Sequence, residues 1–530
     1  MNRIRAVARN TIAQAVRNRV AFVVMGIYLL LVPLLPFIVR GDGTLQGLVN
    51  VVVTYLLILA GALLSVLTVA LASTSLWDEM REKQIFVLES KPVRRWEILV
   101  GKFLGILLID AVMLVFVGIA LLACVRVIMT QERWDLIERE LTRRQITSAR
   151  RVISPRDAVS ADEVRRQYEM LKRDGHLPDG ASEQEMLGQI GEQLTTFANI
   201  VSPRAQRVWT FDNVRAYAGA PALDSGRAAG AEPAALIAEG VSWEPDIWRH
   251  MTVSITAGTG RGQIRSIAAN TSDRIILTNS WDKPPDATSR FRIQSAPTLR
   301  VKFHRSDVAS SDPVACVWGF GIYGTHNFIS TPPAAFKPGE FIEIPVPLNT
   351  VKEDGTLQVR LFNAAQDDTA MVFSGSDAVQ MLLPVSGFTT NLLRSLALLF
   401  AQLAFLAMLG LFFSTYVSFP LAPIATFSLL LVIYMTGMVR TDVEKGYIFQ
   451  QHGGERVSKT YEYFVRGLIA TLDYSLPDFN MGTSLVSTGL EIPWSQVLRS
   501  LAGTAVVRGG LLLLLGAWIF HGRELALHAR

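Results

Sequence analysis

The chain has 530 residues and a formal net charge of +5; 50% of its residues are hydrophobic and only 18% are charged. A single soluble domain of this length would be more polar, with charges spread more evenly along the chain. The composition therefore excludes one soluble domain and indicates a membrane protein. Acidic and basic residues balance each other in the polar segments, which argues against a nucleic-acid partner.

Six apolar stretches are predicted to cross a membrane as helices. Residues 20–39 are twenty uncharged residues, and at about 1.5 Å each they cross a hydrocarbon core of roughly 30 Å. Residues 395–439 contain no Asp, Glu, Lys or Arg. As one helix they would measure about 68 Å, so we predict two spans that turn at Ser418–Pro423. The other three spans are residues 47–76, 103–125 and 500–520.

Basic residues near the span ends indicate the orientation. Five arginines and no acid precede the first span, which places the N-terminus in the cytoplasm. By parity, loop 77–102 and the C-terminus are cytoplasmic, whereas residues 129–388 and 441–496 are extracytoplasmic. We therefore predict a multi-pass protein in the lipid bilayer of a bacterial-type plasma (inner) membrane.

The membrane region is predicted to consist of four segments. Residues 1–19 place apolar residues on one helical side and arginines on the other, as in an amphipathic helix on the inner membrane surface. A basic anchor that only sets the orientation is an equally good and compatible interpretation. Residues 20–128 hold spans one to three, residues 389–440 hold spans four and five, and residues 497–530 hold span six and a tail.

Residues 129–388 are predicted to be an inserted extracytoplasmic α+β domain. Residues 129–205 are charge-dense and helical, and two Ser-x-x-Glu capping boxes mark helix starts. These boxes are Ser160/Glu163 and Ser182/Glu185. Residues 206–388 contain short alternating runs between Gly, Pro and Asp turns, which predicts an antiparallel β-sandwich of jelly-roll or immunoglobulin-like type. The fold class is thus a polytopic α-helical membrane protein that carries a β-sandwich domain.

This domain shows no recognisable catalytic or metal-binding motif. The segment "GTGRGQ" (258–263) joins two strands, so we interpret it as a hairpin turn and not as a phosphate-binding loop. Its histidines lack metal-ligand spacing; they are His250, His304 and His326. Four aromatic residues are interpreted as core, with a ligand-binding surface as the alternative. These are Trp281, Trp318, Phe320 and Tyr323. Cys124 and Cys316 are expected to be unpaired packing residues.

The loop between spans two and three reads "WDEMREKQIFVLESKPVRRWEILVGKFLG" (77–105) and is rich in charges of both signs. It predicts one helix before Pro92 and another after it. Residues 81–105 resemble the signature loop of permeases from the type-two exporter branch of ABC transporters. The matching positions are Glu82, Ile85–Leu88, Pro92, Arg94, Arg95, Glu97, Gly101 and Lys102. The amphipathic N-terminus and the Leu-Pro-containing segment 475–494 also fit, whereas the long insert departs from that family.

The resemblance implies a transport subunit that is not an enzyme and binds no cofactor itself, with ATP and Mg²⁺ on a separate ABC ATP-binding subunit. The chain has no Gly-x-x-x-x-Gly-Lys-Ser/Thr sequence, in agreement with this. A second permease, either another copy or a sister chain, is expected. Loop 77–102 is expected to dock on the ATPase. The contact residues would be Glu79, Glu82, Lys91, Pro92, Arg94, Arg95, Glu97 and Lys102. Without the resemblance, these charges would be interpreted as a solvated loop.

Asp110 and Arg508 are charged residues within predicted spans, a position that is costly in lipid and often functional. We expect them to pair with each other or to line the transport pathway. The alternative is that each side chain extends to the nearer membrane surface.

Three functions are compatible with the sequence. The first is the permease of an ATP-driven exporter. The second is a membrane-anchored binding or sensing protein whose β-sandwich recognises a cell-envelope ligand. The third is a polytopic enzyme acting on lipid-linked sugars, which should carry acidic or histidine clusters at the membrane face. The signature loop favours the first.

Overall fold

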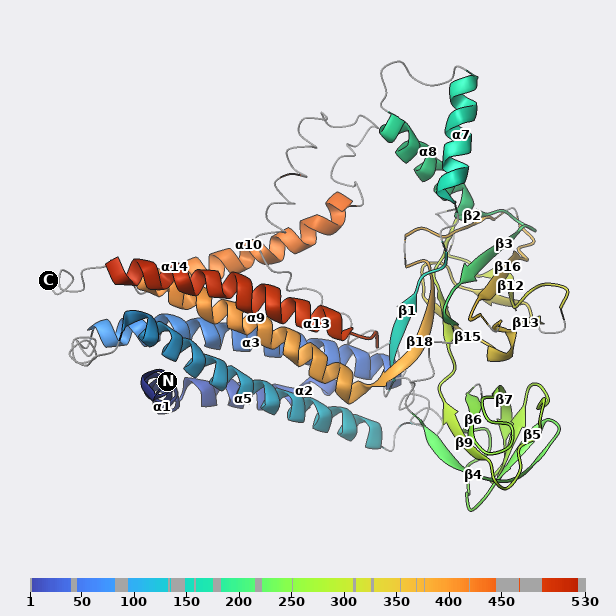
Figure 1. Cartoon of the computed structure of the whole chain (residues 1–530), viewed down its shortest axis with the longest axis horizontal. Helices are drawn as coiled ribbons and strands as arrows, with labels where there is room; N and C mark the ends of the chain where they lie inside the picture. Colours follow the sequence, from blue (N-terminus) through green and yellow to red (C-terminus); the bar gives the residue numbers. More distant parts are fainter. Residues whose placement is uncertain are drawn as a thin grey trace. The chain divides into compact units, whose positions relative to one another are not determined.

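The computed structural model of the chain divides into two compact units: Met1–Arg143 with Phe388–Arg530, and Arg144–Gly387. The first unit is helical and the second is rich in strands (Figure 1). The structure describes residues 2–39, 45–81, 94–131, 134, 148–156, 159–174, 183–214, 222–249, 251–307, 311–325, 328–352, 354–367, 369–375, 377–418, 420–444, 467 and 489–522.

The helical unit consists of one short amphipathic helix, the first in the chain, and of longer, predominantly apolar helices. They are α1 (Asn2–Arg17), α2 (Val20–Ile38), α3 (Leu45–Arg81), α5 (Arg95–Thr130), α9 (Phe388–Tyr416), α10 (Leu421–Glu444), and the continuous run of α13 (Trp494–Ser500), the π-helix η4 (Leu501–Arg508) and α14 (Gly509–Gly522). The break between α9 and α10 falls at the predicted proline-containing turn.

Among the described residues, five helices are long and apolar enough to cross a membrane, so the chain is a multi-pass membrane protein. They are α2, Gly47–Trp77 of α3, α5, α9 and Trp494–Gly522. The predicted fifth span corresponds to α10, whose described apolar part, Leu421–Ile433, is shorter. The total of six spans stays a prediction.

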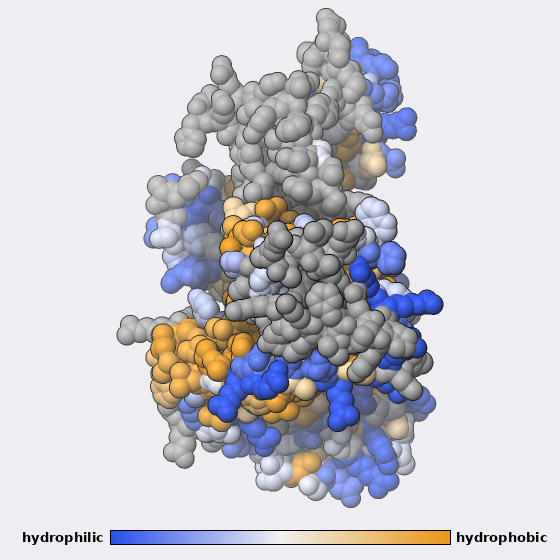
Figure 2. Space-filling view, turned by 90° about the vertical axis from the view of Figure 1, so that its left-hand side faces the viewer, coloured by the Kyte–Doolittle hydropathy of each residue, from blue (hydrophilic) through white to orange (hydrophobic). Residues whose placement is uncertain are grey.

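Helix α9 lies at the centre of this unit and packs against α3, α5, α10 and α14 (Figure 1). Small residues allow close approach where helices cross: a Cβ added at Gly410 would lie 2.8 Å from the Cβ of Ala72. Hydrophobic side chains also reach the molecular surface (Figure 2). In the helical unit, Phe37 and Trp518 are 79% and 76% exposed, as expected of side chains that face lipid.

The strand-rich unit contains a β-sandwich, as predicted. One sheet has the order β1 (Ser148–Ile153), β18 (Val379–Gly387), β10 (Thr298–Val301) and β15 (Ile342–Pro345). The other has the order β13 (Ile329–Ser330), β12 (Val314–Phe320), β16 (Leu357–Asn363) and β3 (Gln206–Phe211), with β14 (Ala334–Phe336) beside β12. A smaller sheet joins β11 (His304–Arg305), β17 (Met371–Val372) and β2 (Ile200–Val201). Inward-facing apolar residues of these strands form one core.

A closed β-barrel corrects the prediction that residues 206–388 form a single sandwich. Its strands, in spatial order, are β4 (Asp224–Glu232), β5 (Ala235–Ala238), β8 (Arg274–Leu277), β7 (Ile264–Asn270), β6 (Thr252–Ala257) and β9 (Arg290–Gln294). The barrel has its own core around Trp248, Trp281 and Phe291. Alternating runs have the same period in a sandwich and in a barrel. The β4–β9 pairing that closes the barrel joins strands far apart in sequence.

The segment predicted to be helical, residues 129–205, is helical only in part. It contains α7 (Ala161–Arg173) and α8 (Glu183–Ala198), but also β1, which pairs with β18. Ser160 caps α7, since its hydroxyl accepts a hydrogen bond from the Glu163 backbone N–H at 3.2 Å. The second predicted capping box begins at Ser182, outside the described residues.

Candidate coupling site at the start of helix α5

Arg95, the first residue of α5, fastens this helix to the end of α14. Its guanidinium donates hydrogen bonds to the carbonyl oxygens of Phe520 at 2.7 Å and His521 at 3.0 Å. The last carbonyls of a helix lack partners within the helix and carry partial negative charge, so a cation stabilises them. Leu76, Leu99 and Phe520 form a buried apolar cluster between the ends of α3, α5 and α14.

Lys102 joins α5 to α3. Its side chain is fully buried, and Nζ donates a hydrogen bond to the carbonyl oxygen of Ser75 at 2.7 Å. A buried ammonium group is costly without hydrogen bonds, so the position of Lys102 depends on the end of α3. This lysine is therefore a structural contact between two helices and is not available to a partner protein.

Arg94 and Glu97 form the N-terminal cap of α5. The Arg94 backbone N–H donates to Oε2 of Glu97 at 2.8 Å, and the acid also lies favourably in the first helical turn. Arg3 of α1 lies 3.9 Å from the same carboxylate, a contact too long and too exposed to add much stability.

Helix α1 packs against α5 at Gly101 and Gly105, a Gly-x-x-x-Gly spacing that places two glycines on one helical face. A Cβ at Gly101 would lie 2.6 Å from Cβ of Val7, and one at Gly105 would lie 2.9 Å from the carbonyl oxygen of Ala8. Only glycine therefore permits this contact. The predicted N-terminal helix is present, with one face buried against α5.

Arg94 directly precedes α5, Arg95 and Glu97 lie in its first turn, and Lys102 is its eighth residue. Glu82, Lys91 and Pro92 lie outside the described residues, and so does the side chain of Glu79. Sequence reasoning missed the hydrogen-bond partners of Arg95 and Lys102. Both partners are backbone carbonyl groups, which every residue type has, so residue identity does not reveal them.

Asp110 and Arg508 do not form the expected pair. The fully buried Asp110 carboxylate accepts a hydrogen bond from Thr68 Oγ1 at 2.9 Å, which joins α5 to α3. Arg508 lies in the π-helix η4 and is half-buried. The pairing prediction is wrong for the single chain, because the Asp110 side chain faces α3.

A buried ion pair that sequence reasoning missed lies at the start of α9. Arg394 Nη1 is 2.9 Å from Glu491 Oε1, and the two side chains are 8% and 7% exposed. Arg394 also donates to the Ile492 carbonyl oxygen, and Asn391 bonds both to this residue and to Leu490. These contacts hold α9 to residues 490–492, next to α13. The only sequence signal was an arginine just before an uncharged span.

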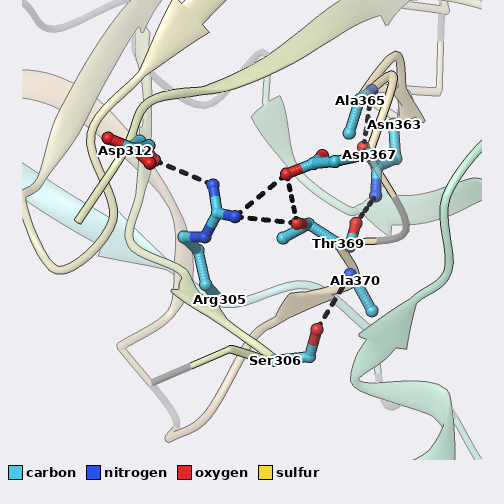
Figure 3. Close-up of polar contacts among 8 residues, drawn as sticks. All are labelled: Arg305, Ser306, Asp312, Asn363, Ala365, Asp367, Thr369 and Ala370. Carbon is cyan, nitrogen blue, oxygen red and sulfur yellow. Dashed lines mark hydrogen bonds and ion pairs between the residues drawn. The ribbon is translucent and has the colours of Figure 1, made fainter. Parts of the chain in front are cut away.

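In the strand-rich unit, the polar cluster around Arg305 is structural. Arg305 donates to the Asp312 carbonyl oxygen, Asp367 Oδ2 and Thr369 Oγ1, while Asn363 bonds to the Thr369 carbonyl (Figure 3). These hydrogen bonds use both terminal nitrogens of Arg305, while its buried Nε has no partner among the described residues. They stabilise the connection between β16 and β17. Within the described part of the chain, no group of three or more His, Cys, Asp or Glu residues is placed to hold a metal ion.

The other predictions for this unit have clear outcomes. Residues 258–263 are a hairpin turn between the antiparallel β6 and β7, as predicted, with positive φ at Gly258, Gly260 and Gly262. Trp281, Trp318 and Phe320 are core residues, whereas Tyr323 is 67% exposed. Cys316 of this unit is free and buried, and so is Cys124 of α5 in the helical unit.

The fold and these contacts define a polytopic membrane protein. Its helices α1, α3, α5 and α14 contact one another at the start of α5, next to loop 77–102. Residues 5–138 match the family model described as ABC-2 family transporter protein, and the match spans α1, α2, α3 and α5. This match covers 134 of the 530 residues and supports an ABC-2 type permease, the membrane component of an ABC transporter. No curated protein and no solved structure matches the chain significantly.

Proposed function

We propose that this permease belongs to an exporter and is energised by a separate ABC ATP-binding subunit that docks on loop 77–102. ATP and Mg²⁺ would bind to that subunit. A second permease, identical or related, completes the assembly. In this proposal both termini are cytoplasmic, residues 129–388 are extracytoplasmic, and the host membrane is a bacterial-type plasma membrane.

The observation that carries this proposal is that the start of α5, directly after the loop, is bonded to or packed against three other helices. Within the first eleven residues of α5, Arg95 forms hydrogen bonds with the end of α14, and Lys102 forms one with Ser75 of α3. Gly101 and Gly105 pack closely against α1. A displacement of the loop would therefore move these helices together as one body, as rigid-body switching requires. Exposed charges on an otherwise unattached loop would transmit no such movement.

The direct test is purification of the tagged protein from its native membrane in mild detergent, followed by identification of co-purifying chains and an ATPase assay. We expect an ATP-binding subunit to co-purify, and Glu82→Ala with Lys91→Ala to reduce its recovery at least tenfold. Arg126→Ala is the matched control, because Arg126 is an exposed arginine elsewhere on α5. Recovery unaffected by the loop variants would contradict docking at this loop.

A further inference from the structure

A basic groove lies on the outer surface of the β-barrel, and neither transport nor ATPase docking accounts for it. It has a volume of about 610 Å³, within the usual range for small-molecule sites of roughly 300–1,000 Å³. Strands β4, β6 and β9 line it. The polar lining residues are Ser225, Arg227, Thr256, Arg290 and Arg292.

The strand register places like charges directly opposite each other in this groove. Arg227 of β4 is paired with Arg290 of β9, and Ser225 is paired with Arg292. Directly opposed side chains on antiparallel strands lie about 5 Å apart at Cβ, and like charges in such positions destabilise a sheet. An arrangement that lowers the stability of the empty barrel becomes favourable when an anion binds between the two guanidinium groups.

Other arginines of the barrel have acidic partners. Arg265 lies 2.8 Å from Asp282, and Arg274 lies 2.8 Å from Glu232. Within the described residues, the three groove arginines form no ion pair. The nearest acid on β4, Asp224, already accepts hydrogen bonds from the Ser225 backbone N–H and from Nε1 of Trp243. The residues that line the groove therefore carry a net charge of about +3, from three arginines and no acid.

Hydroxyl groups complete the groove. Thr256 falls at an irregularity in the β6–β9 register, between Ile255 and Ala257, and β-bulges of this kind redirect side chains at binding sites. Ser225 lies on the opposite edge, on β4. The Thr256 hydroxyl already donates to the Arg290 carbonyl oxygen at 3.2 Å, so Ser225 supplies the hydroxyl donor beside the arginines. A phosphate group has a charge of up to −2 and several acceptor oxygens, so it matches planar guanidinium forks with a flanking hydroxyl donor better than a single carboxylate does.

We propose that this groove binds a phosphate-bearing ligand, with Arg227, Arg290 and Arg292 as the contacting cations. The ligand is either a soluble phosphate compound or the headgroup of a phospholipid, both of which present the same chemistry. This inference does not depend on the direction of transport or on the ATPase partner.

Calorimetric titration of the full-length protein in detergent tests the proposal, with inorganic pyrophosphate and a short-chain, water-soluble phosphatidic acid as separate probes. We expect saturable binding of at least one probe, weakened at least tenfold by Arg290→Gln and by Arg227→Gln. Arg274→Gln should change affinity less than twofold, because Arg274 is an arginine of the same barrel with its own acidic partner. An equal loss of affinity in all three variants would show that the binding is non-specific charge attraction, and it would overturn the proposal.

Thermal unfolding in phosphate-free buffer shows whether the variants fold. Arg227→Gln should unfold at the same temperature as the parent protein or higher, since it removes a repulsive pair.

The relative affinity of the two probes distinguishes the two ligand sources. Tighter Arg290-dependent binding of phosphatidic acid than of pyrophosphate supports a lipid headgroup, and the reverse order supports a soluble ligand. Absence of binding by both probes to a folded protein would refute the site, whereas recovery of the ATP-binding subunit would be unaffected.

Discussion

Arg394 and Glu491 form an ion pair that is almost completely removed from solvent. Burying two charges costs several kcal/mol per ion, and mutual attraction offsets this only if the remaining polar atoms are also bonded. The Ile492 carbonyl oxygen accepts a further hydrogen bond from Arg394, and the Trp494 ring centroid lies 5.2 Å from the guanidinium. The buried Nε of Arg394 has no partner among the described residues. The pair therefore specifies how α9 meets the start of the last span.

Removal of one partner should be more harmful than removal of both. Arg394→Met leaves Glu491 buried without its cation and should lower stability by about 3–5 kcal/mol, while Arg394→Met with Glu491→Met should recover part of the loss. The control Arg156→Met breaks an exposed pair with Asp212 and should cost about 1 kcal/mol or less. Thermal unfolding in detergent measures the stability of the three variants. If Arg394→Met and the control Arg156→Met lowered stability equally, burial of the Arg394–Glu491 pair would be unimportant.

The Cys316 thiol should be unreactive in the folded protein. Burial raises the pKa of this thiol to about 12, so almost no thiolate is present near pH 8. We expect no labelling by a thiol reagent at pH 8 in a Cys124→Ser background, and full labelling after denaturation. Rapid labelling of the native protein would show that the sandwich core opens readily.

At the scale of elements, the contact between α1 and α5 depends on two glycines. Gly105→Ala introduces a Cβ about 2.9 Å from both the Ala8 carbonyl oxygen and Thr11 Cβ. The backbone of α1 must then move, and overpacking of this kind costs about 1–3 kcal/mol.

Gly26→Ala in α2 is the matched control, because an added Cβ there has no neighbour within 4 Å. Alanine favours helix over glycine by up to about 1 kcal/mol, so this substitution should be neutral or stabilising. Thermal unfolding and protease sensitivity of the N-terminus measure the difference. Similar results for both variants would show that α1 does not need its close contact with α5.

At the scale of the whole molecule, Arg95 connects the docking loop to the last span. Arg95→Gln loses two charge-assisted hydrogen bonds to α14, each worth about 1.5–3 kcal/mol. Under the proposed function, the ATP-binding subunit should still co-purify, but its ATP hydrolysis should no longer drive transport. Co-purification with an ATPase and a transport assay in vesicles test this.

Arg126→Gln on the exposed side of α5 provides the control and should transport normally. Loss of the ATP-binding subunit with Arg95→Gln would assign this arginine to docking. Unchanged transport would show that α14 is not moved through Arg95.

Several elements were predictable because they depend on local sequence. The length of uncharged stretches revealed the membrane helices, and the prolines located the break between α9 and α10. Period-two runs indicated many strands of the second unit, since inward and outward residues alternate in any half-buried strand. The family resemblance rested on residues 81–105, and the family match covers this region.

Sequence by itself thus determined the class of the protein, its helices and many of its strands, because hydrophobic length and period are local properties. Only the tertiary structure decided that β4 and β9 close a barrel and that Asp110 faces Thr68. It also decided that Arg95 binds the end of α14, 425 residues further along the chain. Such pairings join distant residues, often through backbone atoms that every residue type shares, so no local pattern encodes them.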